Sequence, residues 1–299
     1  MKKALHPRKP VAGGVLGALL LAVVPFNTAS RGAPPVARAP FAWTPGQIEV
    51  AVHVNGAPAT FLLDTGAEYS VVSTRLATQA GLAVDAAAGR QFADDVTLQL
   101  KAVVLMHQRV MVMPFDTYYE RGRRIDGLLG YDLFARFVVA IDFKHQTLTI
   151  WEPSAFKPRG AAVSVPIEFA GRLALIPAVL KLTAARSLPA RLMLDTGASQ
   201  AVILRYPFAT EHNLLDPSAA PTVANSLASG PRRLLEVPME QISVAKWTFD
   251  RPRVQAYAEP IGSGASVESD GLLGNSLLSR FTLYVDYPHR RLLFEPTAR

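Results

Sequence analysis

Apolar and polar residues alternate along much of the chain, in short segments that end at turn residues. The segment IEVAVHV, which begins at Ile48, is followed by Asn55-Gly56 and then by a second apolar segment that ends at Asp64. Alternation with a period of two is typical of a β-strand with one buried face, and Asn-Gly between two such segments predicts a hairpin. Later segments, among them VTLQL, VVLMHQRVMVMPF and LLEVPMEQISVAKWTF, also alternate. The pattern therefore predicts an all-β fold.

Signals for helices are few and short. After the first apolar pair, Ser73 as an N-cap and Gly81 as a terminator predict one brief helix. A second brief helix is expected between Arg205 and His212. Helices are therefore expected to be minor parts of the fold.

The same series of sequence motifs occurs twice along the chain. TFLLDTGA ends at Ala67 and RLMLDTGA ends at Ala198, so the two Asp-Thr-Gly-Ala motifs begin 131 residues apart, at Asp64 and Asp195. Two further blocks, each containing Asp-Gly-Leu-Leu-Gly, lie 144 residues apart, with the matched residues Asp126/Asp270, Gly127/Gly271, Gly130/Gly274, Arg136/Arg280, Phe137/Phe281 and Asp142/Asp286. Blocks that recur in the same order indicate gene duplication. We therefore expect two lobes related by a pseudo-twofold axis, over residues 48–157 and 158–299.

The start of the chain differs in character from the rest. Residues 1–30 have a basic start, an apolar run from Val11 to Phe26 and small residues at the end, which together predict a secretory signal peptide. The alternative is an uncleaved segment that anchors the protein to the membrane. Residues 31–47, rich in Pro and Ala, are expected to form an extended linker, with the folded part beginning near Ile48. The expected location is secreted or periplasmic, or membrane-anchored facing the periplasm in the alternative.

Composition and charge narrow the possible partners. With 49% hydrophobic residues among 299, the chain can bury cores of ordinary size. The net charge is +7, of which +4 comes from the first thirty residues, and the remaining basic clusters are short and separate. We therefore expect no nucleic-acid partner. Because the sequence has no cysteine, a disulfide framework and a lipid-modified cysteine are excluded, and stability must come from burial.

Each Asp-Thr-Gly motif ends an apolar strand, which would carry a carboxylate from the core to a cleft. Gly66 and Gly197 permit a tight turn and close backbone approach, and the Thr hydroxyl can hydrogen-bond inward and lock the loop. A pseudo-twofold axis would bring the two carboxylates together. Like charges at that distance cannot both ionise, so the pair would hold one proton and offer a base and an acid at once. Activation of a water molecule against an unactivated carbonyl requires this combination.

These motifs resemble those of the aspartic proteases of the pepsin and retropepsin type. The resemblance covers both DTGA and both GLLG motifs and spans residues 48–296. It implies that Asp64 and Asp195 are the catalytic aspartates of an endopeptidase that hydrolyses peptide bonds with a water molecule held between them. It implies supporting roles in the active-site loops for Thr65, Gly66, Thr196, Gly197 and Ser199. It further implies two β-barrel lobes of retropepsin size in one chain, a monomer acting as a pseudo-dimer, a peptide or protein substrate, and no metal or organic cofactor.

The chain departs from the family pattern close to the two aspartates. Ser199 follows the second DTGA, whereas Glu68 follows the first, so one hydroxyl donor is missing and an acid is added. Ala67 and Ala198 stand where acid-active pepsins carry Ser or Thr. Fewer donors to the carboxylate should raise its pKa, so we expect a pH optimum less acidic than that of pepsin. The hairpins that close over substrate in this family, called flaps, are expected around 89–95 and 225–233.

Other chemistries have weaker signals in the sequence. The six histidines show no close metal-ligand pairing, and no GxSxG motif offers a serine nucleophile. Asp94 and Asp95 are expected in a solvated turn, and Asp142 and Asp286 are expected to have a structural role. The alternative function is a non-catalytic peptide-binding protein that retains the fold. A third possibility is an enzyme that processes one dedicated protein partner.

Overall fold

The computed structural model describes residues 34–44, 46–87, 89–114, 119–120, 123–158, 161–226, 230–260 and 268–297. The chain divides into two compact units, residues 1–31 and 32–299, and all described elements belong to the second. The predicted signal peptide lies outside the described residues. Within those ranges, no helix is long and apolar enough to cross a membrane.

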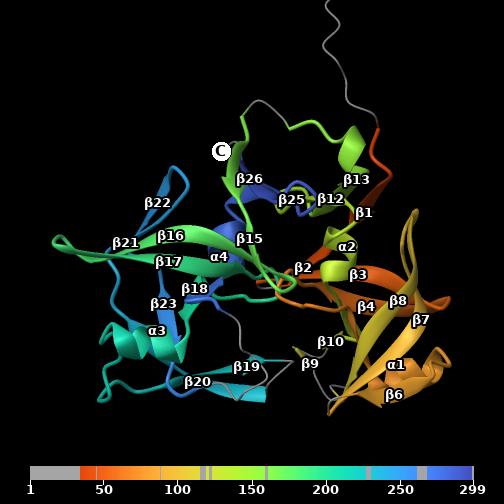
Figure 1. Ribbon diagram of the computed structural model, residues 1–299, viewed down its shortest axis with the longest axis horizontal. Coiled ribbons are helices and arrows are strands. Elements are labelled where there is room, and N and C mark those ends of the chain that lie inside the picture. Colours follow the sequence, from red (N-terminus) through yellow and green to blue (C-terminus); the bar gives the residue numbers. More distant parts are fainter. Residues whose placement is uncertain are drawn as a thin grey trace, which may run out of the picture. The chain divides into compact units, whose positions relative to one another are not determined.

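Strands dominate the second unit and confirm the all-β prediction (Figure 1). The first lobe is an eight-stranded sheet in the order β2 (Ala42–Thr44), β3 (Gln47–Val54), β4 (Ala57–Leu63), β11 (Gly127–Leu129), β5 (Val71–Ser73), β8 (Val103–Met113), β7 (Arg90–Leu100) and β6 (Val84–Ala87). Strand β3 also pairs with β7, so the sheet curls back on itself. A separate short hairpin is formed by β9 (Tyr119–Glu120) and β10 (Arg123–Arg124).

The second lobe repeats this arrangement in a ten-stranded sheet. Its order is β19 (Thr222–Ser226), β20 (Gly230–Val237), β23 (Val254–Tyr257), β18 (Val202–Leu204), β24 (Gly271–Leu273), β17 (Arg186–Leu194), β16 (Leu173–Thr183), β21 (Gln241–Val244) and β22 (Trp247–Asp250), with β15 (Glu168–Ala170) paired to β16. In both lobes the strand that leads into the Asp-Thr-Gly motif, β4 or β17, runs parallel to the Gly-Leu-Leu strand, β11 or β24. The duplication seen in the sequence is therefore a duplication of topology.

A six-stranded sheet joins the two halves of the chain. Its order is β1 (Ala37–Pro40), β13 (Thr147–Trp151), β12 (Val138–Asp142), β25 (Phe281–Asp286), β26 (Arg291–Pro296) and β14 (Val163–Pro166). The central pair is antiparallel, with Val139 opposite Val285 and Asp142 opposite Thr282. Reading outward from this pair, each half supplies equivalent strands in the same order, as a pseudo-twofold axis requires.

The predicted linker, residues 31–47, contains strand β1 of this sheet and strand β2 of the first-lobe sheet. Strand β1 pairs with β13, and the side chains of Ala37, Ala39 and Phe41 are buried. β14 is the counterpart of β1 in the second half. The ordered chain therefore begins before Ile48, earlier than expected, because alternate small apolar side chains bury well in a sheet even where Pro-rich composition suggests a linker.

The local predictions agree with the structure. The turn between β3 and β4 has positive φ at Asn55 (46°) and Gly56 (85°), as the favoured two-residue hairpin turn requires. Helix α1 (Thr74–Gln79) begins after Ser73, whose hydroxyl accepts a hydrogen bond from the N–H of Leu76. The remaining helices are also short: α2 (Tyr131–Phe134), η1 (Pro153–Ala155), α3 (Tyr206–Glu211) and α4 (Asn275–Leu278).

The core follows the alternation seen in the sequence. On β3, Val50, Val52 and Val54 are buried while Ala51 and His53 are exposed. One large cluster of buried apolar side chains includes residues of both lobes and of the six-stranded sheet. Complete burial of a large aliphatic or aromatic side chain contributes about 1.5–3 kcal/mol, so this core can hold the fold without disulfides.

Candidate active site

The two Asp-Thr-Gly loops are held at the ends of parallel strand pairs. The N–H of Asp64 donates to the carbonyl of Leu129, at 2.9 Å, and the N–H of Asp195 donates to the carbonyl of Leu273, at 3.0 Å. Each aspartate is thus the first residue beyond its strand, fixed by the Gly-Leu-Leu strand beside it. The pattern of an apolar strand followed by Asp-Thr-Gly produces this geometry in both lobes.

Thr65 and Thr196 join the two loops through four hydrogen bonds. The Thr65 hydroxyl donates to the carbonyl of Leu194 at 2.8 Å, and that of Thr196 donates to the carbonyl of Leu63 at 2.8 Å. Each hydroxyl also accepts from the backbone N–H of the opposite threonine, at 3.0 Å in both directions. Both side chains are buried. These four bonds tie one lobe to the other where the carboxyl groups lie.

The two loop glycines make room for the carboxyl groups. A Cβ atom at Gly66 would lie 2.9 Å from Cγ of Asp195, and one at Gly197 would lie 2.6 Å from Cγ of Asp64. Side chains are not tolerated at such distances, so glycine is required for each carboxyl group to approach the opposite loop. Each carboxyl group therefore lies against the loop that carries the other. That the two aspartates are catalytic stays a prediction.

The pKa of each carboxyl group is raised, but not equally. Burial is the largest cause for both. For Asp64 the negative charge of Asp195 raises the pKa further, to well above its usual range. For Asp195 the effect of burial is opposed by hydrogen bonds from the N–H groups of Gly197 and Ala198, both at 3.0 Å, and by the charge of Arg205, all of which lower its pKa. Asp64 also accepts a hydrogen bond from the N–H of Gly66, at 2.8 Å, which lowers its pKa, so the charge of Arg205 is the contribution that only Asp195 receives.

Ser199 and Glu68 occupy equivalent places and meet the opposite half of the chain. A Cβ atom at Gly46, just before β3, would be 2.2 Å from Cβ of Ser199. One at Gly171, just before β16, would be 3.3 Å from Oε1 of Glu68, and Arg172 donates to the Glu68 carbonyl at 3.3 Å. In the described part of the chain, neither side chain hydrogen-bonds to Asp64 or Asp195. Both side chains therefore support the interface between the halves.

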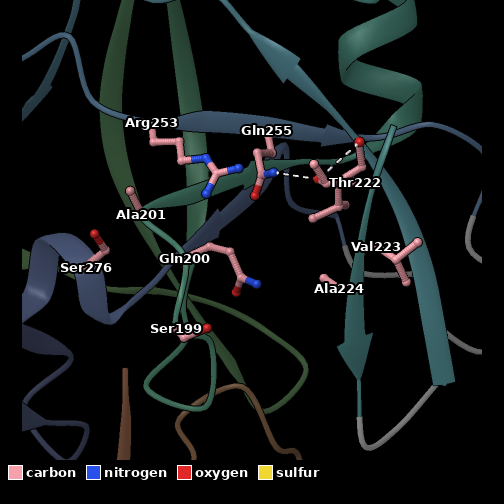
Figure 2. A pocket seen from close by; sticks show the side chains of 10 residues that line it. Ser199, Gln200, Ala201, Thr222, Val223, Ala224, Arg253, Gln255 and Ser276 are labelled. Carbon is pink, nitrogen blue, oxygen red and sulfur yellow. Dashed lines mark hydrogen bonds between the residues drawn. The ribbon is translucent and has the colours of Figure 1, made fainter. Parts of the chain in front are cut away.

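Ser199 also borders a cavity of about 290 Å³ in the second lobe (Figure 2). The side chain of Gln200 points into the space between the Asp-Thr-Gly loop and the β19–β20 hairpin. The far wall is formed by Thr222, Ala224, Leu234 and Gln255, among others. The cavity therefore adjoins the second Asp-Thr-Gly loop, and its volume is large enough to admit an amino-acid side chain.

Hairpins occur where flaps were expected. Strands β6 and β7 pair with Ala87 opposite Arg90, and β19 and β20 pair with Ser226 opposite Gly230. Residues 88 and 227–229, which come between the paired strands in the sequence, lie outside the described residues. The hairpins are therefore confirmed, and their role over a substrate stays a prediction.

Three residues near the carboxyl groups were not predicted from the sequence. Asn275 donates its amide to the carbonyls of Thr196, at 2.6 Å, and Gly46, at 2.7 Å. The hydroxyl of Tyr287 is buried without a hydrogen-bond partner among the described residues, and burial and both aspartates raise its pKa. Arg205 follows β18 and lies in the field of Asp195. Each of the three differs from the residue at the corresponding position of the first copy. A comparison of the two copies, position by position, could therefore have identified them.

The other acidic residues have structural partners. Asp142 accepts hydrogen bonds from the backbone and ring of His145, and buried Asp286 pairs with His289 and Arg291, all as expected for structural carboxylates. Asp94 and Asp95 are exposed. No group of metal-ligating side chains able to hold an ion occurs in the ranges that the structure describes.

Comparisons with known proteins agree with this fold and site. The solved structure of the aspartic proteinase from Irpex lacteus matches with a TM-score of 0.53 and 14% identity, over 88% of this chain and 97% of that chain. At that identity the match establishes the fold, that of a bilobal aspartic proteinase. A family model described as aspartyl protease matches residues 50–133 and 182–277, segments that include both DTGA and both GLLG motifs. These segments cover more than half of the chain, which therefore belongs to the aspartyl protease family. No curated protein matches it.

Proposed function

We propose that this protein is an endopeptidase in which Asp195 is the general base and Asp64 the general acid. The observation that carries the proposal is the buried carboxyl pair with unequal surroundings. Two braced loops bring the buried carboxyl groups together, and the charge of Arg205, which acts on Asp195, favours the ionised form there. A base and an acid are then available together at one place.

In the proposed reaction a water molecule lies between the two carboxyl groups and attacks the scissile carbonyl carbon. Asp195 takes a proton from the water as its oxygen bonds to that carbon, and Asp64 gives its proton to the carbonyl oxygen. The product of this step is a neutral tetrahedral gem-diol. Collapse of the gem-diol breaks the C–N bond, Asp195 gives a proton to the leaving nitrogen, and Asp64 recovers its proton from a hydroxyl of the gem-diol. The site returns to its starting protonation state, and the step uses no redox partner.

The substrate and location are part of the same proposal. We expect a peptide or protein substrate bound by a monomer, since one chain supplies both loops. The leader-like composition of residues 1–30 supports a secreted or periplasmic enzyme, or one anchored to the membrane and facing the periplasm.

The test is peptide cleavage by the purified protein across a range of pH, with and without pepstatin. Asp64→Asn and Asp195→Asn should each lower kcat by at least about a thousandfold while folding normally, because each removes one member of the acid–base pair. Asp94→Asn, which changes an exposed carboxyl group, is the matched control and should keep full activity. Full cleavage by either dyad variant would overturn the assignment. Binding without cleavage by the unaltered protein would favour the peptide-binding alternative.

A further inference from the structure

One face of the second-lobe sheet carries three arginines close to the candidate active site. Arg232 lies on β20 opposite Ala224, in register to share a face with Leu234. Leu234 lies opposite Tyr257 on β23, and Arg205 directly follows β18, which runs beside β23. Arg253, just before β23, lines the cavity that also borders Ser199 and Gln200 (Figure 2).

Only one of these arginines is neutralised by a carboxylate in the described structure. Glu236 accepts two hydrogen bonds from Arg253, at 2.9 and 2.6 Å. Arg205 donates from Nε to the hydroxyl of Ser269, at 2.8 Å, and lies in the field of Asp195, but it makes no ion pair among the described residues. Nε of Arg232 is buried and has no hydrogen-bond partner there. Buried donors and cations without partners are costly, so this arrangement fits a missing anionic ligand.

Tyr257 lies within the electrostatic influence of both arginines that lack an ion pair, Arg205 and Arg232. Its ring is largely buried, and both Arg205 and Arg232 act on the pKa of its hydroxyl, as does Asp195. Burial raises the pKa of the Tyr257 hydroxyl, which therefore stays protonated and can donate a hydrogen bond. Two guanidinium groups and a phenol at one face offer the donors that a carboxylate prefers.

The corresponding face of the first lobe has a different character. Ser73 and Met113 occupy the places of Arg205 and Tyr257: Ser73 and Arg205 are the helix N-caps, and Met113 and Tyr257 are the last residues of the strands beside them. Phe92 lies on β7, opposite Met111 of the strand that ends at Met113. Phe92 packs against Tyr69, with ring centroids 5.4 Å apart. In the second lobe Gln200 replaces Tyr69 and faces the cavity. The space filled by an aromatic pair in one lobe is therefore polar and open in the other.

We propose that Arg205, Arg232 and Tyr257 form a carboxylate-binding subsite, so that the preferred substrates carry an acidic group beside the scissile bond, on the side bound by the second lobe. This rests on the proposed function and specifies its substrate class. The carboxylate is either a Glu or Asp side chain or the C-terminus of the peptide, since both present the same two oxygens to the arginines.

The test uses the full chain and short synthetic peptides in matched sets. Each set places Glu, Gln or Lys in turn at every position around a common cleavage site, with either a free or an amidated C-terminus. The unaltered protein should cleave a Glu peptide about tenfold faster than its Gln partner in kcat/KM, as expected for one added charge-assisted contact. A preference that follows the free C-terminus instead identifies the terminal carboxylate as the ligand. Equal cleavage of all members would overturn the proposal.

Three variants show whether the arginines cause this preference. Arg232→Gln should reduce the Glu/Gln ratio about tenfold, and Arg232→Lys should retain part of it. Arg205→Gln is an independent second variant with the same expected direction. Arg233→Gln is the control, because this exposed arginine lies next along β20 with its side chain on the opposite face. An unchanged ratio in both Arg232→Gln and Arg205→Gln would overturn the assignment.

Binding separates failure of this inference from failure of the proposed function. Fluorescein-labelled forms of the same peptides are titrated with the Asp195→Asn variant, and anisotropy gives Kd. Tighter binding of the Glu peptide without cleavage by the unaltered protein would support the subsite and contradict the protease assignment. Cleavage without any preference for an acidic group in kcat/KM or Kd would do the reverse. Neither cleavage nor charge-dependent binding would overturn both.

Discussion

The two copies of the Asp-Thr-Gly loop share a backbone but not a chemical environment. Thr65 and Thr196 make the same hydrogen bonds across the interface at the same distances. Asp64 and Asp195 nevertheless differ, because their N–H donors come from different residues and only Asp195 lies in the field of Arg205. Duplication therefore preserves the geometry that holds the carboxyl groups together, and substitutions around each copy make the electrostatic surroundings of the two carboxyl groups unequal.

The largest expected effect comes from filling the space that the loop glycines leave. Gly197→Ala should lower kcat/KM by about a hundredfold or more, since the new Cβ would lie 2.6 Å from Cγ of Asp64 and displace it. Gly66→Ala should be less severe, because the corresponding distance to Asp195 is 2.9 Å. Steady-state cleavage and thermal unfolding measure both effects. Gly81→Ala, at a positive-φ turn outside the site, should lower stability but not turnover. Unchanged turnover in Gly197→Ala would contradict the observed approach of the loops.

Thr65 and Thr196 should contribute equally to stability, although the surroundings of the two carboxyl groups differ. Thr65→Val and Thr196→Val each leave a buried N–H and a buried carbonyl unpaired, which should lower the free energy of unfolding by about 2–4 kcal/mol. Thr→Ser at either position keeps the hydroxyl and should recover most of the loss. Urea unfolding followed by fluorescence provides the measurement. A clear difference in the free energy of unfolding between the two Val variants would show that the two threonines do not contribute equally to stability.

The pH profile should reveal the difference between the two carboxyl groups. The proposed mechanism requires Asp195 ionised and Asp64 protonated, and both pKa values are raised, so a bell-shaped profile is expected with its acidic limb above the ordinary Asp pKa of about 3.9. Arg205 lowers the pKa of Asp195, so Arg205→Gln should raise that pKa and move the acidic limb to higher pH. Profiles of kcat/KM measured with a peptide lacking acidic groups test this shift. Arg233→Gln is the control, and a limb that moves toward lower pH would exclude the assigned direction.

The smallest effect is expected at Glu68 and Ser199, the residues that directly follow the two Asp-Thr-Gly-Ala motifs and differ between them. Glu68→Ser and Ser199→Ala should each change kcat by less than about threefold, because within the described structure neither side chain bonds to the carboxyl groups. The same cleavage assay applies to both. A loss of tenfold or more in Ser199→Ala would assign its hydroxyl a direct part in the chemistry.

The sequence predicted those features that depend on neighbouring residues. The Asn55-Gly56 hairpin and the Ser73 cap are local signals, and the meeting of Asp64 with Asp195 followed from recurrence of a motif in a duplicated chain. Strand β1 was not predicted, because its partner β13 lies far along the chain and its own composition resembles a linker.

The electrostatic features of the site depend on contacts that the sequence does not show. Whether Asp64 or Asp195 holds the proton depends on burial and on the place of Arg205. Asn275 contacts the carbonyls of Thr196 in its own half and Gly46 in the other, and the hydroxyl of Tyr287 lies buried in the field of both aspartates. Comparison of the two copies identifies such positions, but three-dimensional structure is needed to give them partners.

The six-stranded sheet makes the duplicated chain a single cooperative structure. Strands β12 and β25 pair along the middle of this sheet, so separating the halves would expose two long rows of unpaired backbone groups. Neither half is therefore a self-sufficient domain, although each repeats the topology of the other. A chain cut in the connection between β13 and β14 would still be held together as two complementary fragments, whereas either fragment alone would present an open edge that favours self-association.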